Sequence, residues 1–283
     1  MRPARLPAPM VVATGLVSGW GRGLEALPDR AEEAAAGRPV IAIEGPVVVG
    51  DRFRRASREC LLAVAAVEET LQSGIPREVL AGNRTALLYA TLSAYGASNR
   101  AFIEGARATS LHFPYTAPSA VPAEVAIEFG ITGPYVIFLG GAPAALSALW
   151  YAGTLLAAAA CDRALVLAVE TFNECADLYA RGRWLVGRPL VEAAVAVLLE
   201  PGAGVLTYSE ARSGRRVRAS RSTGRRRLGE AFACGPLVEL GLARATGAGP
   251  LDLSLTGAWR GTEAVLRWAE ARPTWSQKKF STS

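Results

Sequence analysis

Residues 126–170 read AIEFGITGPYVIFLGGAPAALSALWYAGTLLAAAACDRALVLAVE, and this stretch decides the fold. A short helical segment at 123–129 ends at a glycine, a residue that commonly closes helices. The apolar run 135–139 is typical of a buried strand, and the long charge-free helix 143–160 leads into a second such run at 164–170. This alternation of helix and strand predicts an α/β protein built in layers.

The charge-free segment 143–161 has almost the length of a membrane span. It is rich in alanine and carries serine, glycine and threonine, so its transfer free energy is much weaker than that of a span rich in leucine and isoleucine. Asp162 and Arg163 follow at once and lead into the strand-like run. The pattern therefore favours a buried helix that feeds a buried strand, and no membrane span is expected.

Helix and strand also alternate on both sides of this centre. Before it we expect a strand at 10–14 ended by Gly15, an amphipathic helix within 52–71 and a strand at 84–92. After it we expect a hairpin between 191–200 and 205–208, a helix at 236–245, an apolar run at 251–255 and a final helix at 262–271.

Cysteine and histidine content limits the chemistry. The four cysteines lie far apart and form no CxxC motif, and the chain has one histidine: the residues are Cys60, Cys161, Cys175, Cys234 and His112. They predict neither a zinc site nor a disulfide framework, and they favour a reducing, cytoplasmic setting. We expect no metal and no cofactor.

The motif TGxxxGxG at 14–21 follows the first strand with the spacing of the phosphate-binding turn of short-chain dehydrogenases. Catalysis in that family uses a tyrosine followed four residues later by a lysine, and no tyrosine here meets this condition. The only lysines are Lys278 and Lys279 near the end of the chain. The motif therefore does not indicate a dehydrogenase.

Two motifs in the same order resemble the β-ketoacyl synthases. VVATGLVS at 11–18, followed by a Gly-x-Gly turn, is similar to that family's first strand. In the stretch 126–170, a Thr-Gly-Pro segment leads along a strand into a small-residue turn and a buried helix, as it does in the family. The resemblance covers residues 10–208 and implies a thiolase-like layered α/β/α fold, with the N-terminal half retained and the C-terminal half truncated.

The resemblance also implies how the chain is organised. We expect a ketosynthase-like N-terminal domain at 1–208, an Arg-rich loop at 209–228, a reduced C-terminal remnant at 229–273 and a flexible tail at 274–283.

In β-ketoacyl synthases the turn before the buried helix reads Thr-Ala-Cys-Ala-Ser-Gly or similar, and its cysteine is the nucleophile. The same register here reads LGGAPAA at 139–145, which places Ala142 at the nucleophile position. A methyl group cannot attack a thioester, so acyl transfer to this position is excluded. Condensing synthases also use two histidines from their second half, whereas no histidine follows His112. Condensation and malonyl decarboxylation by this chain alone are therefore not supported.

The resemblance further implies a dimer in which the strand before the nucleophile position pairs across a two-fold axis. The interface candidates are His112, Phe113, Val136, Ile137, Phe138 and Leu139. A nucleophile-free chain with such a surface is similar to the chain length factors of type II polyketide synthases, in particular the reduced subunits of aryl-polyene and highly reducing polyene assembly. These subunits associate with an active β-ketoacyl synthase and help close the far end of its acyl tunnel. By family register, the tunnel candidates are Leu92, Tyr95 and Phe102, with interface packing as the alternative interpretation.

The formal net charge of +6 is concentrated in one segment, because eight arginines fall between Arg212 and Arg227. Arginine recognises acidic surfaces and phosphate groups well, so this segment is a candidate docking site for an acyl carrier protein. The candidate residues are Arg215, Arg216, Arg225, Arg226 and Arg227. A solvated loop is the alternative interpretation, and nucleic-acid binding is disfavoured because the segment lacks interleaved aromatic residues and a recognisable module.

Two other functions stay open at this stage. The chain could be an acyltransferase or decarboxylase in its own right that uses His112 or Cys175, although packing in an apolar loop or an interface is the simpler interpretation of both side chains. It could also be a scaffold that only stabilises its ketosynthase partner.

Overall fold

The computed structural model describes residues 5–45, 53, 56–105, 112–172, 188–212, 222–247 and 249–271. The strands are β1 (Arg5–Leu6), β2 (Met10–Ser18), β3 (Gly21–Arg22), β4 (Val40–Ile41), β5 (Thr85–Thr91), β6 (Tyr135–Leu139), β7 (Arg163–Glu170), β8 (Leu190–Val191), β9 (Ala193–Glu200), β10 (Gly204–Arg212), β11 (Asp252–Trp259) and β12 (Thr262–Glu270). The helices are α1 (Ala31–Ala34), α2 (Arg58–Leu71), α3 (Gly96–Ile103), α4 (Ala120–Phe129), α5 (Ala142–Ala157), α7 (Thr223–Leu228) and α8 (Cys234–Thr246), with 3-10 turns η2 (Arg77–Leu80) and η3 (Phe113–Thr116).

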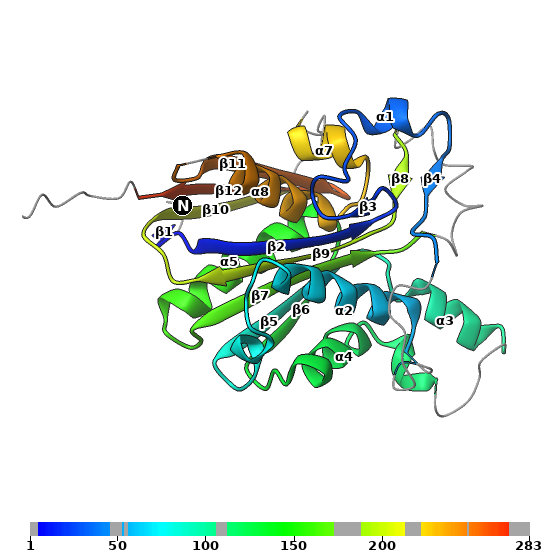
Figure 1. Ribbon diagram of the computed structural model, residues 1–283, viewed down its shortest axis with the longest axis horizontal. Helices are drawn as coiled ribbons and strands as arrows, with labels where there is room; N and C mark the ends of the chain where they lie inside the picture. The colour runs from blue at the N-terminus through cyan, green and yellow to red at the C-terminus, as the bar shows by residue number, and fades with distance from the viewer. Residues whose placement is uncertain are drawn as a thin grey trace, which may run out of the picture.

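Two sheets and two sets of helices form the layers of the described chain (Figure 1). The larger sheet has the strand order β3-β2-β9-β7-β5-β6, and the smaller has the order β1-β10-β12-β11. Helices α2 and α4 pack on one side of the larger sheet, whereas α5 and α8 lie between the two sheets. The layered α/β fold expected from the sequence is confirmed.

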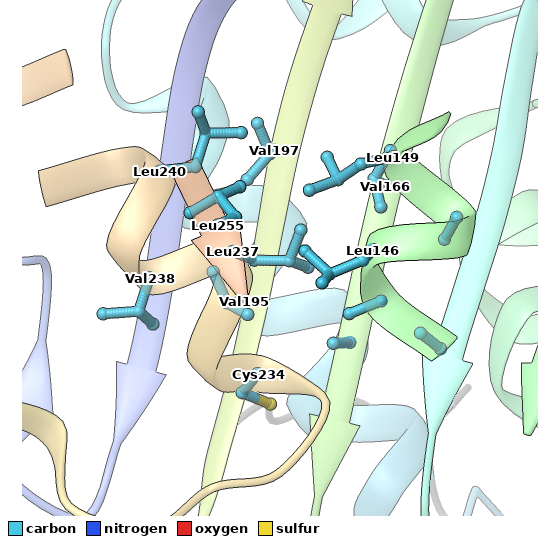
Figure 2. Packing of buried hydrophobic residues seen from close by; sticks show 14 of the residues in the cluster. Leu146, Leu149, Val166, Val195, Val197, Cys234, Leu237, Val238, Leu240 and Leu255 are labelled. Atoms are coloured by element: carbon cyan, nitrogen blue, oxygen red, sulfur yellow. The ribbon is translucent and has the colours of Figure 1, made fainter. Parts of the chain in front are cut away.

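The layer between the sheets contains the larger apolar core (Figure 2). Side chains of α5 and α8 meet those of β9 from one sheet and β11 from the other: Leu146, Leu149, Leu237, Leu240, Val195, Val197 and Leu255. All of them are buried, so truncation of any one of the leucines to alanine should cost about 2–5 kcal/mol. The segment 234–255 is therefore an integral part of the core.

Strand β2 runs past the glycine at which the sequence predicted its end. A side chain at Gly15 would place its Cβ 2.3 Å from both the Ala66 carbonyl oxygen and the Thr70 backbone nitrogen of α2. The glycine lets the helix approach the strand closely, and it does not mark a turn. The predicted strand 10–14 was too short for this reason.

The predicted hairpin between 191–200 and 205–208 is wrong. Strand β9 pairs with β2 and β7 in the larger sheet, whereas β10 pairs with β1 and β12 in the smaller one. Seven of the eight residues of β9 are buried, which is the burial of a central strand covered on both faces. The chain therefore crosses from one sheet to the other between these two strands.

The predicted helix at 262–271 is also wrong, because this segment is strand β12. Its buried residues Ala264, Leu266 and Trp268 recur every second position and face the core. The intervening Val265 and Ala269 gave the run an apolar density that sequence periodicity could not separate from a helix.

The predicted Arg-rich loop at 209–228 is regular at both of its ends. Residues 209–212 complete β10, and residues 223–228 form α7, whose N-cap Ser222 accepts a hydrogen bond from the backbone N–H of Arg225. The predicted helix at 236–245 is confirmed as α8. The predicted flexible tail at 274–283 lies outside the described residues, and no helix in the described part of the chain is long and apolar enough to cross a bilayer.

Candidate functional site

The turn between β6 and α5 consists of Gly140 and Gly141 and leads directly into the buried helix. Gly140 follows the strand with φ of +148°, a conformation that only glycine adopts readily, and its N–H donates to the Thr91 carbonyl at 2.9 Å. Helix α5 begins immediately afterwards at Ala142. The first residue of the buried helix therefore stands where the sequence comparison placed the nucleophile.

The surroundings of Ala142 are closed by strand β11. A Cβ built on Gly257 would lie 2.8 Å from the Ala142 Cβ, and a Cβ built on Gly141 would lie 3.3 Å from the Trp259 ring. The approach at Gly257 leaves no room for a side chain, and that at Gly141 leaves little. The methyl group of Ala142 is thus packed against the second sheet, in a position that offers no nucleophilic atom.

An aromatic row borders the same turn. Phe232 lies between Phe172 and Trp259, with ring centroids 5.7 and 5.3 Å apart and edge-on geometry in both pairs. Its φ of +39° is in the left-handed region, which is unfavourable for a bulky residue and persists only where the surroundings enforce it. A cavity of about 60 Å³ borders both Phe232 and Ala142.

Glu170 connects two loops at the end of β7. Its carboxyl group is fully buried and accepts N–H bonds from Leu92 at 2.7 Å, Ser93 at 3.3 Å and Ala233 at 3.2 Å. Burial raises the pKa of Glu170 to about 8, with the backbone N–H groups acting in the opposite direction. Glu170 thereby ties the turn after β5 to the loop that carries Phe232.

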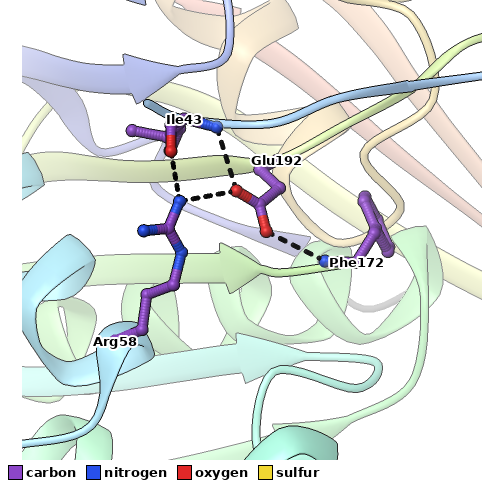
Figure 3. Close-up of polar contacts among 4 residues, drawn as sticks. All are labelled: Ile43, Arg58, Phe172 and Glu192. Atoms are coloured by element: carbon purple, nitrogen blue, oxygen red, sulfur yellow. Dashed lines mark hydrogen bonds and ion pairs between the residues drawn. The ribbon is translucent and has the colours of Figure 1, made fainter. Parts of the chain in front are cut away.

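Glu192 makes a second buried connection, shown in Figure 3. It accepts hydrogen bonds from the backbone N–H of Ile43 at 2.9 Å and of Phe172 at 3.2 Å, and it forms an ion pair with Arg58 at 2.9 Å. Arg58 also donates to the Ile43 carbonyl. One carboxylate therefore joins three segments that are distant in the sequence.

Three of the four cysteines lie in the described residues, and all three are buried. Burial raises the pKa of the Cys60 thiol to about 12 and that of Cys234 well above its usual value, so neither is a thiolate at neutral pH. Cys175, the candidate for an independent acyltransferase, lies outside the described residues.

The three tunnel candidates do not form one cluster. Leu92 and Tyr95 belong to the turn between β5 and α3, close to the Gly140 turn through the Thr91 carbonyl. Phe102 lies near the other end of α3, about 10 Å away at about 1.5 Å per residue. There its ring contacts Phe113 at a centroid distance of 5.7 Å, so a tunnel candidate and an interface candidate pack together.

The interface candidates of β6 lie on an edge strand, because β5 is the one strand with which β6 pairs among the described residues. Val136, Ile137 and Phe138 are partly buried, whereas Leu139 is 58% exposed and the neighbouring Tyr135 is 61% exposed. His112 and Phe113 are in a different place, at the N-terminus of η3.

The arginine candidates in the described residues have different environments. Arg225 pairs with Glu230, and Arg227 donates to the carbonyls of Leu27 at 2.6 Å and Pro28 at 3.3 Å. Arg226 is exposed on α7, while Arg215 and Arg216 lie outside the described residues. Arg225 and Arg227 therefore have structural roles that sequence reasoning did not foresee.

Sequence reasoning also missed Glu170, Glu192 and Phe232. A signal for the two glutamates was present, because each is an isolated carboxylate beside or within a long apolar run. Buried carboxylates need hydrogen-bond partners, so such a residue marks a point where loops converge. No comparable signal distinguishes Phe232.

The chain is similar to a known protein family in sequence and to solved structures in fold. Residues 48–187 match the family model of the β-ketoacyl synthase N-terminal domain. No curated protein sequence is significantly similar to the chain.

Solved structures give the fold. The complex AntDE:AntF, a type II polyketide synthase acyl carrier protein with its ketosynthase, aligns with a TM-score of 0.72 and 13% identity over 94% of this chain and 100% of the matched chain. The ishigamide ketosynthase/chain length factor aligns with a TM-score of 0.68 and 15% identity over 93% of this chain and 99% of the matched chain. The ketosynthase ApeO in complex with its chain length factor ApeC, from Xenorhabdus doucetiae, aligns with a TM-score of 0.61 and 14% identity over 92% of this chain and 99% of the matched chain. The chain is a β-ketoacyl-synthase-like protein that carries the N-terminal domain of that family at residues 48–187 and has the thiolase-like ketosynthase fold.

Proposed function

We propose that the chain is a non-catalytic subunit of the chain-length-factor type, which forms a heterodimer with an active β-ketoacyl synthase and shapes the acyl tunnel during polyketide or polyene elongation on an acyl carrier protein. The observation that carries the proposal is the glycine turn that leads from β6 into α5, where the family register puts Ala142, a residue without a nucleophilic atom, at the nucleophile position. The framework of a ketosynthase is kept where its chemistry has been lost. A partner that supplies the cysteine gives such a framework a use.

Strand β6 supplies the surface for that partner. Leu87 donates to the Pro134 carbonyl and Gly140 donates to the Thr91 carbonyl, both at 2.9 Å, so the even-numbered backbone positions of this segment face β5. The N–H and C=O groups of Tyr135, Ile137 and Leu139 therefore point away from the sheet. An unpaired apolar edge of this kind is a template for a strand from another chain.

Co-expression with a ketosynthase encoded beside this chain tests the proposal. We expect the two chains to co-elute on size-exclusion chromatography and to elongate malonyl-loaded carrier protein only when both are present. Substitution of the partner's active-site cysteine should abolish elongation, because this chain has no nucleophile at Ala142. Elongation or decarboxylation by this chain alone would instead establish it as an enzyme in its own right, and full activity of the ketosynthase without it would contradict the proposal.

Chain-length control is assigned to Leu92 first, because this residue lies beside the Gly140 turn. We expect Leu92→Ala in the active complex to shift products toward longer chains, since a smaller side chain leaves room that added methylenes can fill. Phe102→Ala is the matched comparison at the far end of α3, where the Phe113 contact favours packing. A product distribution unchanged by Leu92→Ala in an intact complex would remove this role.

Carrier-protein docking is assigned to the Arg-rich segment, and α7 allows a clean test of it. Charge reversal at Arg225 or Arg227 would break contacts that hold the fold, whereas Arg226→Glu changes an exposed side chain. We expect the carrier protein to bind the Arg226→Glu, Arg215→Glu, Arg216→Glu variant several-fold more weakly at low salt. Equal binding by this variant and the wild-type complex would contradict the docking role.

A further inference from the structure

A cavity of about 400 Å³ lies beside the free edge of β6. Its lining includes the three consecutive residues Ile137, Phe138 and Leu139. Successive side chains of a strand point to opposite faces, and here Phe138 packs in the core under α5 whereas Ile137 packs in the core under α2. The cavity thus contacts residues from both faces of β6, and among the described strands the edge of β6 opposite β5 is unpaired.

The far wall of the cavity comes from α5 and from the smaller sheet. It includes Ser147 of α5, Glu210 of β10, and Trp259, Arg260 and Thr262 around the hairpin between β11 and β12. Trp259 on this wall and Phe138 on the opposite one give the cavity two aromatic side chains that face a mixed polar and apolar lining. The cavity therefore lies between the unpaired edge of β6 and the Trp259 side chain.

The polar end of the cavity has a defined hydrogen-bond direction. The Tyr208 hydroxyl donates to Glu210 Oε2 at 2.6 Å and lies 2.9 Å from Ser147 Oγ. Burial, followed by the hydrogen bond to Glu210, raises the pKa of Tyr208 to about 12, so this phenol stays a neutral donor committed to the carboxylate. Glu210 is exposed, and its remaining oxygen is available to accept a hydrogen bond from an occupant of the cavity.

Charge selects the kind of donor. Arg260 is exposed at the tip of the hairpin and lies on the lining of the cavity, so a second cation beside it would be repelled. A neutral donor on an aromatic ring satisfies both the carboxylate and the aromatic walls. Tyrosine and tryptophan have this combination, and both are common anchors at protein interfaces.

We propose that the cavity receives a tyrosine or tryptophan side chain of the partner subunit, projected from the strand that pairs with β6. This inference rests on the proposed heterodimer and adds to it a specific anchor site on this chain. The ring lies between Phe138 and Trp259, and its N–H or O–H donates to Glu210.

Three variants of this chain, purified with the partner, test the anchor by the dissociation constant of the complex. Thr262→Trp fills the cavity from its rim and should weaken the complex by about tenfold or more, as loss of an interface anchor does. Glu210→Gln should weaken it by about threefold to tenfold through the weaker acceptor. Ser209→Trp is the matched control, because this exposed neighbour of Glu210 on β10 faces away from the cavity and should leave the affinity unchanged.

Ile137→Pro separates failure of the anchor from failure of the heterodimer. The Ile137 N–H points away from β5, so proline removes a donor of the free edge and no bond of the existing ladder, and Ile137→Ala controls for the lost side chain. A complex broken by Ile137→Pro but unaffected by Thr262→Trp and Glu210→Gln overturns the anchor and leaves the heterodimer standing. If the complex still forms with Ile137→Pro, this result contradicts both the β6 interface and the anchor that depends on it.

Discussion

Two buried glutamates, Glu170 at the end of β7 and Glu192 between β8 and β9, are stabilised by different kinds of partner. Glu170 ends β7 directly opposite Ala193, the residue that follows Glu192. Both carboxyl groups are fully buried, and both accept hydrogen bonds from backbone N–H groups of other segments of the chain. Glu192 also has an arginine, Arg58, whereas the partners that the described residues give Glu170 are neutral N–H and hydroxyl groups.

The difference shows what each connection can tolerate. A buried ion pair is a poor source of net stability, but removal of one member leaves an uncompensated charge that is strongly unfavourable. A buried carboxyl group without a cation instead retains its proton, and the pKa of Glu170 is accordingly raised to about 8. The Arg58 side of the site should therefore be sensitive to mutation, and the Glu170 side should be sensitive to pH.

The largest effect is expected from Arg58→Met. This substitution removes the counterion of Glu192, so that neither buried glutamate is paired with this arginine. The free energy of unfolding should fall by about 3–5 kcal/mol, because Glu192 keeps its burial and loses its counterion. Urea denaturation at pH 7 measures the loss.

The control for this prediction is Arg30→Met, which breaks an ion pair with Glu33 of similar length, 2.6 Å, whose members are 58% and 65% exposed. That substitution should change stability by less than about 1 kcal/mol. Equal losses in the two variants would show that burial of Glu192 does not determine the cost. The double variant Arg58→Met, Glu192→Leu should recover much of the loss, since an apolar pair needs no counterion.

The second prediction concerns the pH dependence of the wild-type chain. The folded-state pKa of Glu170 lies at about 8 and its usual value is 4.5, so the folded state binds the proton more tightly across this interval. The stability contributed by this group is fully present below pH 4.5 and is lost as the pH rises toward 8, with a slope of at most about 1.4 kcal/mol per pH unit. Denaturation midpoints at pH 5.5, 6.5 and 7.5 should therefore fall in that order, and Glu170→Gln should flatten this trend. A wild-type slope that Glu170→Gln leaves unchanged would assign the trend to other groups.

The sequence predicted the elements around the nucleophile turn closely. The run 135–139 is β6 as expected, and Gly130 closes α4 in the left-handed conformation with φ of +67°. These elements are specified locally, because an apolar run between glycines has few alternatives. The assignment of Ala142 to the nucleophile position depends on one residue in a recognisable register, and it stays a prediction.

The strands beyond residue 190 were harder to predict, because their partners are distant in the sequence. Strand β9 pairs with β2, which lies near the start of the chain, so no local pattern around 191–200 could exclude the expected hairpin. The role of Glu170 likewise depends on Leu92 and Ala233, which approach it only in the folded chain. The framework of the site was therefore readable from sequence, whereas the hydrogen bonds that hold its loops were not.

The smallest effect is expected from Glu170→Gln at pH 6, which is below the raised pKa of Glu170. Glu170 is protonated there, so the amide replaces a neutral acid of almost the same shape. Its carbonyl oxygen can keep the bonds from Leu92 and Ala233, while the amide nitrogen loses the long 3.3 Å bond from Ser93 and can donate to Thr91. The cost should be about 1 kcal/mol, the value of one ordinary hydrogen bond. Glu192→Gln at the same pH should cost more, because it removes the charge that Arg58 faces, and an equal cost in the two variants would mean that the arginine does not distinguish them.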